Sequence, residues 1–416
     1  MIKKPYKRHV EPRLKESLKD SPVVLIQGPR QCGKTTLAQM VGKRLGYQYF
    51  TLDDDNTRNY AVADPVGFVN SLPERVILDE AQLAPGLFPS IKLSVDRNRS
   101  AGRFMLTGSV DLLQMRPIKE SLAGRMDIVQ LHPFSQSELE QTPPRFLDNL
   151  FSPNFTVRQK LPSESKIIER IMAGGYPAAI RRPATRRSNW YQAYIETLVE
   201  KDAPLISNIH ALDALPKLLE LAAAQTAQLL NVNNLASSFK LNRLTIQNYL
   251  VLLEKMFLLE RIPAWHGNYK KRITKTPKIH LKDTGVICAL MNFNKDALLD
   301  NRNILGHLLE TFVLQELQRQ ASAHIQRHAF YHFRERDRSR AEVDIVIERG
   351  ATALAGVEVK ASGTITNSDF KGLRKLKEIT GERFKGGVLL YTGDSTLSFG
   401  GNLYALPVRT LWEKHR

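Results

Sequence analysis

The stretch SPVVLIQGPRQCGKTTLAQMVGKRLG, residues 21–46, decides the fold of the N-terminal third of the chain. The aliphatic run Val23 to Ile26 predicts a buried strand, and the residues after Lys34 follow a helical pattern. Between them, residues 28–35 match the motif G-x-x-x-x-G-K-T. A strand, this loop and a helix in that order indicate a phosphate-binding loop.

The backbone N–H groups of this loop are expected to converge on phosphate, because Gly28 and Gly33 permit the turn and the following helix adds its positive end. Lys34 is expected to reach the β- and γ-phosphates, and Thr35 to ligate Mg²⁺. The sequence therefore predicts ATP and Mg²⁺ as cofactors. The predicted nucleotide-binding residues are Gly28, Pro29, Arg30, Gln31, Cys32, Gly33, Lys34, Thr35, Thr36 and, further along the chain, Ser109.

Two later apolar runs end in polar residues that suit a place beside this loop. RVILDEAQ, residues 75–82, ends its strand in Asp79 and Glu80. We predict that Asp79 holds Mg²⁺ through water and that Glu80 polarises the attacking water. A solvated strand end would explain one acid but explains the pair poorly. RFMLTGS, residues 103–109, ends in Thr107 and Ser109, which either sense the γ-phosphate or cap the next helix.

An arginine supplied by a neighbouring subunit can stabilise the charge that develops on a transferred phosphate. Arg125, in SLAGRM, is the first candidate for this catalytic role. Arg97 and Arg99, in VDRNRS, are the next candidates. The alternative for each is an ordinary surface arginine.

Composition and charge indicate where such a protein works. The 416 residues suggest two to four domains, and the net charge of +18 favours a polyanionic partner, DNA before an anionic membrane. The alternative to such a partner is that the positive charge is spread evenly over the surface and serves only solubility. Two distant cysteines, Cys32 and Cys288, argue against a disulfide framework and a zinc site and favour a cytoplasmic location. No apolar run approaches the roughly 20 residues of a membrane helix, so no membrane partner is expected.

The middle of the chain predicts a linker and then a helix-turn-helix with a wing. Residues 141–162 are rich in proline and polar residues and lack periodicity. An apolar helix ending near Leu230, a helix at 232–239, a KLNR turn and a helix at 244–256 precede two strands around a basic tip, 266–277. A winged helix used only as an interdomain lever is the alternative to one that contacts DNA. The predicted DNA contacts are Arg243, Asn248, Lys270, Lys271 and Arg272, with Lys275 also at the tip.

The C-terminal part predicts the order α-β-β-β-α-β. In AEVDIVIERGATALAGVEVKAS, residues 341–362, a tight hairpin would place Asp344 across from Glu358, where two carboxylates repel. A divalent cation between them, Mg²⁺ or Mn²⁺, would turn this repulsion into binding, and Glu310 on the preceding helix would be a third ligand. Lys360 would orient water or neutralise the phosphate. The alternative is an ordinary hairpin with a solvated face.

Two family resemblances follow from these motifs. Residues 5–140 resemble the AAA-type ATPases of bacteria and archaea, through GPRQCGKTTL, VILDEAQ, FMLTGS, SLAGR and HPFSQSEL. The end of the chain resembles the PD-(D/E)xK restriction-endonuclease-like superfamily, through its catalytic acids Asp344 and Glu358, its lysine Lys360 and the helix acid Glu310. The whole order is similar to that of a widespread group of prokaryotic ATPases.

The resemblance implies an α/β multidomain protein that hydrolyses ATP and acts on duplex or branched DNA, as a homo-oligomer for which a hexameric ring is one form. A nucleotide-dependent signalling switch, whose degenerate nuclease fold only binds, is the alternative. The expected parts are a P-loop AAA-type ATPase domain (residues 1–140), a linker and helical segment (141–205), a winged-helix domain (206–282) and a nuclease-like domain (283–416).

Overall fold

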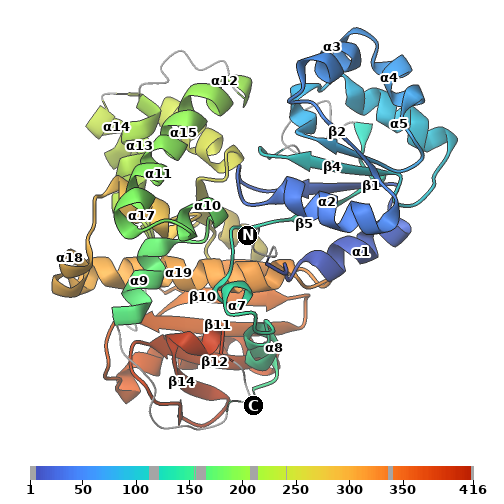
Figure 1. Ribbon diagram of the computed structural model, residues 1–416. Coiled ribbons are helices and arrows are strands. Elements are labelled where there is room, and N and C mark those ends of the chain that lie inside the picture. Colours follow the sequence, from blue (N-terminus) through green and yellow to red (C-terminus); the bar gives the residue numbers. More distant parts are fainter. Residues whose placement is uncertain are drawn as a thin grey trace. The chain divides into compact units, whose positions relative to one another are not determined.

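The computed structural model describes residues 6–111, 121–153, 155, 165–206, 214–239, 241–335 and 341–413. The chain divides into two compact units, shown in Figure 1. The first comprises the chain up to Phe134 with residues 255–257 and 322–325, and the second holds the remainder. The continuous N-terminal stretch of the first unit therefore ends at Phe134 rather than at residue 140, and the second unit is not divided near residues 205 and 282, where the sequence analysis places boundaries.

The first unit is built on a parallel five-stranded sheet in the order β2-β3-β4-β1-β5. Its strands are β1 Val23–Gln27, β2 Gln48–Thr51, β3 Val76–Asp79, β4 Phe104–Gly108 and β5 Met126–Gln130. Its helices are α1 Glu11–Asp20, α2 Lys34–Leu45, α3 Asp55–Ala63, α4 Pro65–Ser71 and α5 Leu87–Arg97. Every residue of β1, β3 and β4 is buried, which explains their unbroken apolar sequences. Because these strands are parallel, their C-terminal ends meet at one edge of the sheet.

The second unit begins with a set of helices and a small three-stranded sheet. The helices are α7 Gln136–Leu139, α8 Phe146–Phe151, α9 Ser165–Ala173, α10 Pro177–Ile180, α11 Ala184–Thr197, α12 Ala203–Ile206, α17 Thr284–Leu290 and α18 Lys295–Asp300. A three-stranded sheet, in the order β6-β8-β7, follows with its helices. The elements in chain order are α13 Ala214–Ala224, β6 Gln228–Leu229, α14 Val232–Phe239, α15 Arg243–Lys255, β7 Leu259–Ile262, α16 Tyr269–Thr274 and β8 Lys278–Leu281.

Two details of this region differ from the sequence prediction. The apolar helix ends at Ala224 rather than near Leu230, because the chain turns at Ala227 (φ 61°) and Gln228–Leu229 pair with β8. The basic tip between β7 and β8 is not a simple loop, since it contains the short helix α16.

The C-terminal domain follows the predicted order α-β-β-β-α-β. Its elements are α19 Arg302–Ser322, β9 His328–Arg334, β10 Glu342–Arg349, β11 Ala353–Lys360, α20 Lys371–Thr380 and β12 Phe384–Tyr391. Two strands that the sequence analysis did not foresee, β13 Leu397–Ser398 and β14 Leu403–Pro407, extend the sheet to six, in the order β13-β14-β12-β11-β10-β9. Figure 1 shows α19 running alongside this sheet.

Helix α20 packs closely on the six-stranded sheet. Leu373 and Leu376 of this helix are fully buried in a cluster with Val343 and Leu354 of the sheet. A Cβ atom at Gly372 would lie 1.7 Å from the carbonyl oxygen of Glu342. Only glycine permits this approach, so Gly372 sets the spacing between α20 and β10.

No helix within the described ranges is both long and apolar enough to cross a bilayer.

A buried ionic network joins α19 to the start of the second unit. Glu316 Oε2 accepts a hydrogen bond from the backbone N–H of Gln136 (2.8 Å), and its Oε1 accepts one from Arg319 (2.9 Å). Arg319 also contacts Asp283, at 3.2 Å. Burial raises the pKa of Glu316 to about 7, because desolvation outweighs the opposing effect of Arg319.

This raised pKa predicts a pH-dependent contribution to stability. In the unfolded chain Glu316 titrates near its ordinary value of 4.5, so its contribution is fully present below that pH and is lost as pH rises towards 7. We expect its part of the unfolding free energy to fall by roughly 1–3 kcal/mol across this window. Urea unfolding should therefore give a flatter pH dependence for Glu316→Gln than for the wild type. Equal slopes for the two proteins would contradict the prediction.

Candidate nucleotide site and acidic cluster

The phosphate-binding loop follows β1 and has the strand–loop–helix geometry that its motif predicts. Gly33 has φ 103°, a conformation that favours glycine, and Gln31 has φ 61°. A Cβ atom at Gly28 would lie 2.0 Å from the carbonyl oxygen of Leu131, so a side chain there would collide with the backbone. The ammonium of Lys34 donates to the carbonyl oxygens of Gly28 (3.0 Å) and Pro29 (2.9 Å). Lys34 therefore lies within the loop that it is predicted to serve.

Arg8 supports this loop from a distant part of the sequence. Its guanidinium donates to the carbonyl oxygens of Cys32 (2.9 Å) and His132 (2.5 Å) and lies 4.6 Å from the centre of the Phe134 ring. Arg8 thus ties the loop to the chain that follows β5. Sequence reasoning missed it, because no local pattern connects residue 8 with residue 32.

Asp79, at the end of β3, faces Thr35 at the start of α2. The Thr35 hydroxyl lies 2.9 and 3.0 Å from the two carboxylate oxygens of Asp79. Thr107 and Tyr49 donate to the same carboxylate, at 2.5 and 2.8 Å. Burial and the carboxylate of Asp79 raise the pKa of Tyr49 to about 12, so the phenol stays protonated and donates. The hydroxyl and carboxylate oxygens of Thr35 and Asp79 are hard donors of the kind that Mg²⁺ prefers.

Glu80 lies beside Asp79 in an uncommon backbone conformation, with φ 54°. Its backbone N–H donates to the hydroxyl of Thr107, at 3.0 Å. Its carboxylate accepts hydrogen bonds from Ser109 (3.0 Å) and from Gln82, which sequence reasoning missed. Thr107 therefore orients Asp79, and Ser109 holds the carboxylate of Glu80. The alternative role of these hydroxyls, capping the next helix, falls on residues 112–120, outside the described residues.

The candidate arginines lie on the same unit, away from the edge of the sheet where Asp79 and Glu80 lie. Arg125 makes a bidentate ion pair with Asp96, with distances of 2.6 and 3.1 Å. Arg97 and Arg99 are exposed. The predicted role of Arg125 in a neighbouring subunit stays a prediction.

The C-terminal acids come together as the sequence analysis predicts. Ile345 pairs with Val357 in the antiparallel ladder of β10 and β11, which puts Asp344 opposite Glu358. Asp344 accepts a hydrogen bond from the backbone N–H of Val359 (3.0 Å). Burial and the nearby Asp344 raise the pKa of Glu358 well above its ordinary value, which favours the protonated acid.

A lysine that sequence reasoning missed lies among these acids. The Lys278 ammonium, at the start of β8, lies 2.9 Å from Glu310, 3.0 Å from Asp344 and 3.2 Å from Glu342. Its side chain is only 4% exposed. Burial alone would lower its pKa, but Asp344, Glu310 and Glu342 together hold the pKa of Lys278 well above its ordinary value. A charged residue in the buried strand KIHL was the available signal, because such a charge needs a counter-ion.

This geometry does not fit the predicted metal site. The ammonium of Lys360 lies 2.5 Å from Asp369, and its predicted role beside Asp344 and Glu358 stays a prediction. The ammonium of Lys278 contacts Glu310 and Asp344, two of the three acids that were expected to hold the divalent cation. Among the described residues, no group of three or more His, Cys, Asp and Glu side chains is arranged to hold a metal ion.

The predicted DNA contacts are divided by the structure. Arg243, Asn248, Lys270 and Lys271 are exposed. Arg272 is not at the surface: it is 6% exposed and makes a bidentate ion pair with Glu348, at 2.8 and 3.0 Å. Consecutive residues of a helix point about 100° apart, so α16 turns Arg272 inward while Lys270 and Lys271 stay outside. The prediction that Arg272 belongs to the exposed tip is therefore wrong.

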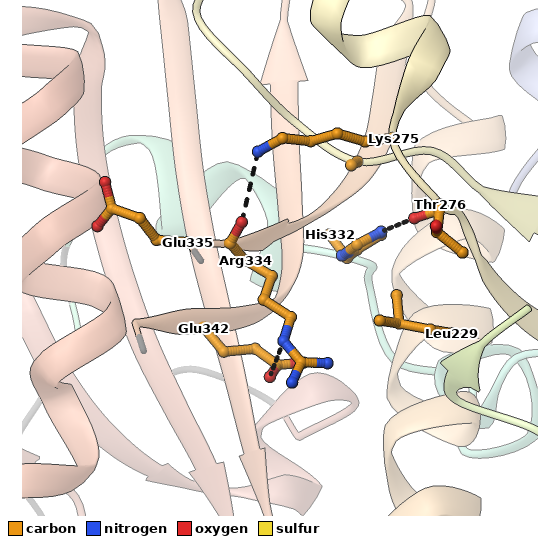
Figure 2. A pocket seen from close by; sticks show the side chains of 8 residues that line it. Leu229, Lys275, Thr276, His332, Arg334, Glu335 and Glu342 are labelled. Carbon is orange, nitrogen blue, oxygen red and sulfur yellow. Dashed lines mark hydrogen bonds and ion pairs between the residues drawn. The ribbon is translucent and has the colours of Figure 1, made fainter. Parts of the chain in front are cut away.

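Two cavities flank the segment before β8. One, of about 560 Å³, is bounded by Lys275, Thr276, His332, Arg334 and Glu342 (Figure 2). The other, of about 630 Å³, is lined by Arg243 and Gln247 of α15 together with the same Lys275 and Thr276. Basic side chains thus line both cavities.

Comparison with known proteins agrees with the nucleotide site. Residues 20–140 match the model of a family described as an AAA domain. Residues 164–297 and 305–411 match two families described as domains of unknown function, DUF8612 and DUF4143. With the phosphate-binding loop, Asp79 and Glu80 at one edge of a parallel sheet, the protein is an ATPase of the P-loop AAA type.

Curated relatives span most of the chain. The uncharacterized protein Rv2008c of Mycobacterium tuberculosis is 30% identical over 366 residues, which cover 86% of this chain and 74% of the relative. The uncharacterized protein Mb2031c of Mycobacterium bovis matches to the same extent. The chain belongs to the family of these two mycobacterial proteins.

Solved structures give more remote likenesses. The Walker-type ATPase PABY2304 of Pyrococcus abyssi is 16% identical, with a TM-score of 0.44, over 70% of this chain and 97% of that one. The RuvB Holliday junction branch migration motor of Thermotoga maritima is 16% identical, with a TM-score of 0.29, over 61% and 89%. The ORC2 protein of Aeropyrum pernix is 14% identical, with a TM-score of 0.32, over 70% and 92%. These likenesses are too remote to carry a function to this chain.

Proposed function

We propose that this protein couples Mg²⁺-dependent ATP hydrolysis to the remodelling, translocation or processing of DNA in the cytoplasm. The observation that carries the proposal is the set of exposed basic residues Arg243, Lys270 and Lys271 on the helix-turn-helix and its small sheet. The order of helices and strands from α13 to β8 supports a winged helix, and the net charge of +18 supports a polyanionic partner. The C-terminal order of elements supports a PD-(D/E)xK-like fold.

At the nucleotide site, each side chain has a distinct task. Lys34 neutralises charge on the β- and γ-phosphates, and the loop N–H groups bind them. Thr35 and Asp79 would hold Mg²⁺, which supplies charge stabilisation to the transferred phosphoryl group. Glu80, held by Ser109, orients and polarises the attacking water. In a homo-oligomer, for which a hexameric ring is one form, Arg125 would exchange Asp96 for the phosphate of a neighbouring subunit.

The test is the ATPase rate with no DNA and with linear duplex, single-stranded or four-way junction DNA. Stimulation by at least one DNA form is the expected result. A rate unchanged by every form would contradict DNA action and favour a nucleotide-dependent switch that binds other partners.

The exposed lysines predict a change in the salt dependence of DNA binding. Changing Lys270 and Lys271 together to Gln removes two phosphate contacts, so we expect the slope of log affinity against log salt to become shallower by about 2. Titration of labelled duplex DNA at several salt concentrations by fluorescence anisotropy measures the slope. The control changes Lys371 and Lys377, exposed on α20, to Gln. Equal effects of the two double substitutions would show that the tip makes no particular contribution.

A further inference from the structure

Lys278 lies where two parts of the second unit meet. It belongs to β8, the central strand of the three-stranded sheet, whereas its partners belong to α19 and the six-stranded sheet. We call Glu310, Glu342, Asp344 and Glu358 the acidic cluster. The Lys278 ammonium contacts three of these four acids, at 2.9 to 3.2 Å.

Three other nearby basic groups do not replace Lys278 as counter-ion. Lys360 is paired with Asp369, at 2.5 Å. His280 Nε2 lies 3.8 Å from Glu310, but burial lowers the pKa of His280 well below its ordinary value, so its ring is neutral. Arg334 lies 3.7 Å from Glu342 and is 52% exposed, at the edge of the cluster. Lys278 is therefore the buried positive charge that Glu310 and Asp344 share.

A divalent cation in the same place would compete with this ammonium. Mg²⁺ needs oxygen ligands at about 2.0–2.1 Å from the metal, on carboxylates that are deprotonated. Here Glu310 and Asp344 already face an ammonium at 2.9 and 3.0 Å. A metal bound to the same two oxygens would lie against a buried positive charge and be repelled by it.

We propose that the ammonium of Lys278 is the counter-ion of the acidic cluster and takes the place of a divalent metal. The cluster then binds no metal, and its ion pairs with Lys278 join the three-stranded sheet to the six-stranded sheet. These acids then support no metal-dependent cleavage. The inference is independent of the proposed DNA action, because it concerns what the cluster holds and not what the protein acts on.

The test measures Mn²⁺ binding to the full-length, nucleotide-free protein by electron paramagnetic resonance of free Mn²⁺. All variants carry Asp79→Asn, which removes the carboxylate among the two predicted metal ligands of the nucleotide site. With Lys278 intact, we expect no bound Mn²⁺ up to millimolar concentration. Adding Lys278→Met should create one Mn²⁺ site, with an affinity for Mn²⁺ at least tenfold higher than that of the protein that retains Lys278. Adding Asp344→Asn to that variant should remove the site. The matched control is Lys282→Met, which breaks the Lys282–Glu260 ion pair (2.8 Å) outside the cluster.

The protein that retains Lys278 gives the decisive result even if Lys278→Met fails to fold. Binding of one Mn²⁺ to the Asp79→Asn protein, lost on adding Asp344→Asn or Glu358→Gln, would overturn the proposal. So would Mn²⁺-dependent DNA cleavage that Glu358→Gln abolishes. Absence of Mn²⁺ binding and of Mn²⁺-dependent cleavage in the Asp79→Asn protein that retains Lys278 supports the proposal.

Discussion

Replacing Glu80 by Gln is expected to slow ATP hydrolysis by about 10²–10⁴-fold, the usual contribution of a group that accepts a proton from the nucleophile. Gln keeps the shape and a hydrogen-bond acceptor for Ser109, but its amide cannot polarise water as a carboxylate does. Nucleotide binding should persist, because Lys34, Thr35 and the loop are unchanged. Steady-state phosphate release and the affinity for a fluorescent ATP analogue measure the two effects separately.

Glu74→Gln is the matched control for this substitution. Glu74 is exposed just before β3, so the same change of charge occurs on the same unit away from the loop. It should leave hydrolysis and binding as in the wild type. A Glu80→Gln protein that hydrolyses ATP within about threefold of the wild-type rate would exclude Glu80 as the water-activating residue.

Replacing Lys278 by Met is expected to lower the unfolding free energy of the second unit by about 3–5 kcal/mol, because Glu310 and Asp344 would stay buried without their counter-ion. This is a large part of the 5–15 kcal/mol that typically stabilises a domain. All three tryptophans, Trp190, Trp265 and Trp412, lie in the second unit. Tryptophan fluorescence during urea unfolding therefore reports on this unit alone.

A second variant separates lost charge balance from lost packing. Lys278→Met combined with Glu310→Gln and Asp344→Asn removes the acids together with the ammonium, and replacing a whole buried ion pair by neutral groups is often nearly neutral. We expect this triple variant to recover most of the stability. If it is as unstable as Lys278→Met, the ion pairs are not what the lysine contributes.

The nucleotide site was predictable to a large extent because its parts are local. The loop from Gly28 to Thr35 is continuous, and its function depends on backbone conformation, which glycine positions signal in the sequence. Asp79 and Glu80 follow an apolar strand, and parallel strands bring their C-terminal ends to one edge. The supporting contacts of Arg8 and Tyr49 were not predictable, since no local pattern marks a side chain that reaches across the fold.

For this protein, the sequence by itself determined the strand–loop–helix of the nucleotide site and the register that sets Asp344 opposite Glu358. Both depend on residues that are near in the chain, with a turn at Gly350 (φ 65°) joining the second pair. Only the tertiary structure decided what the acids face. Lys278 is 32 residues from Glu310 and 66 from Asp344, and packing of two sheets brings its ammonium between them. The same packing turned Lys360 to Asp369 and Arg272 to Glu348, because a buried charge takes the counter-ion that the fold places within reach.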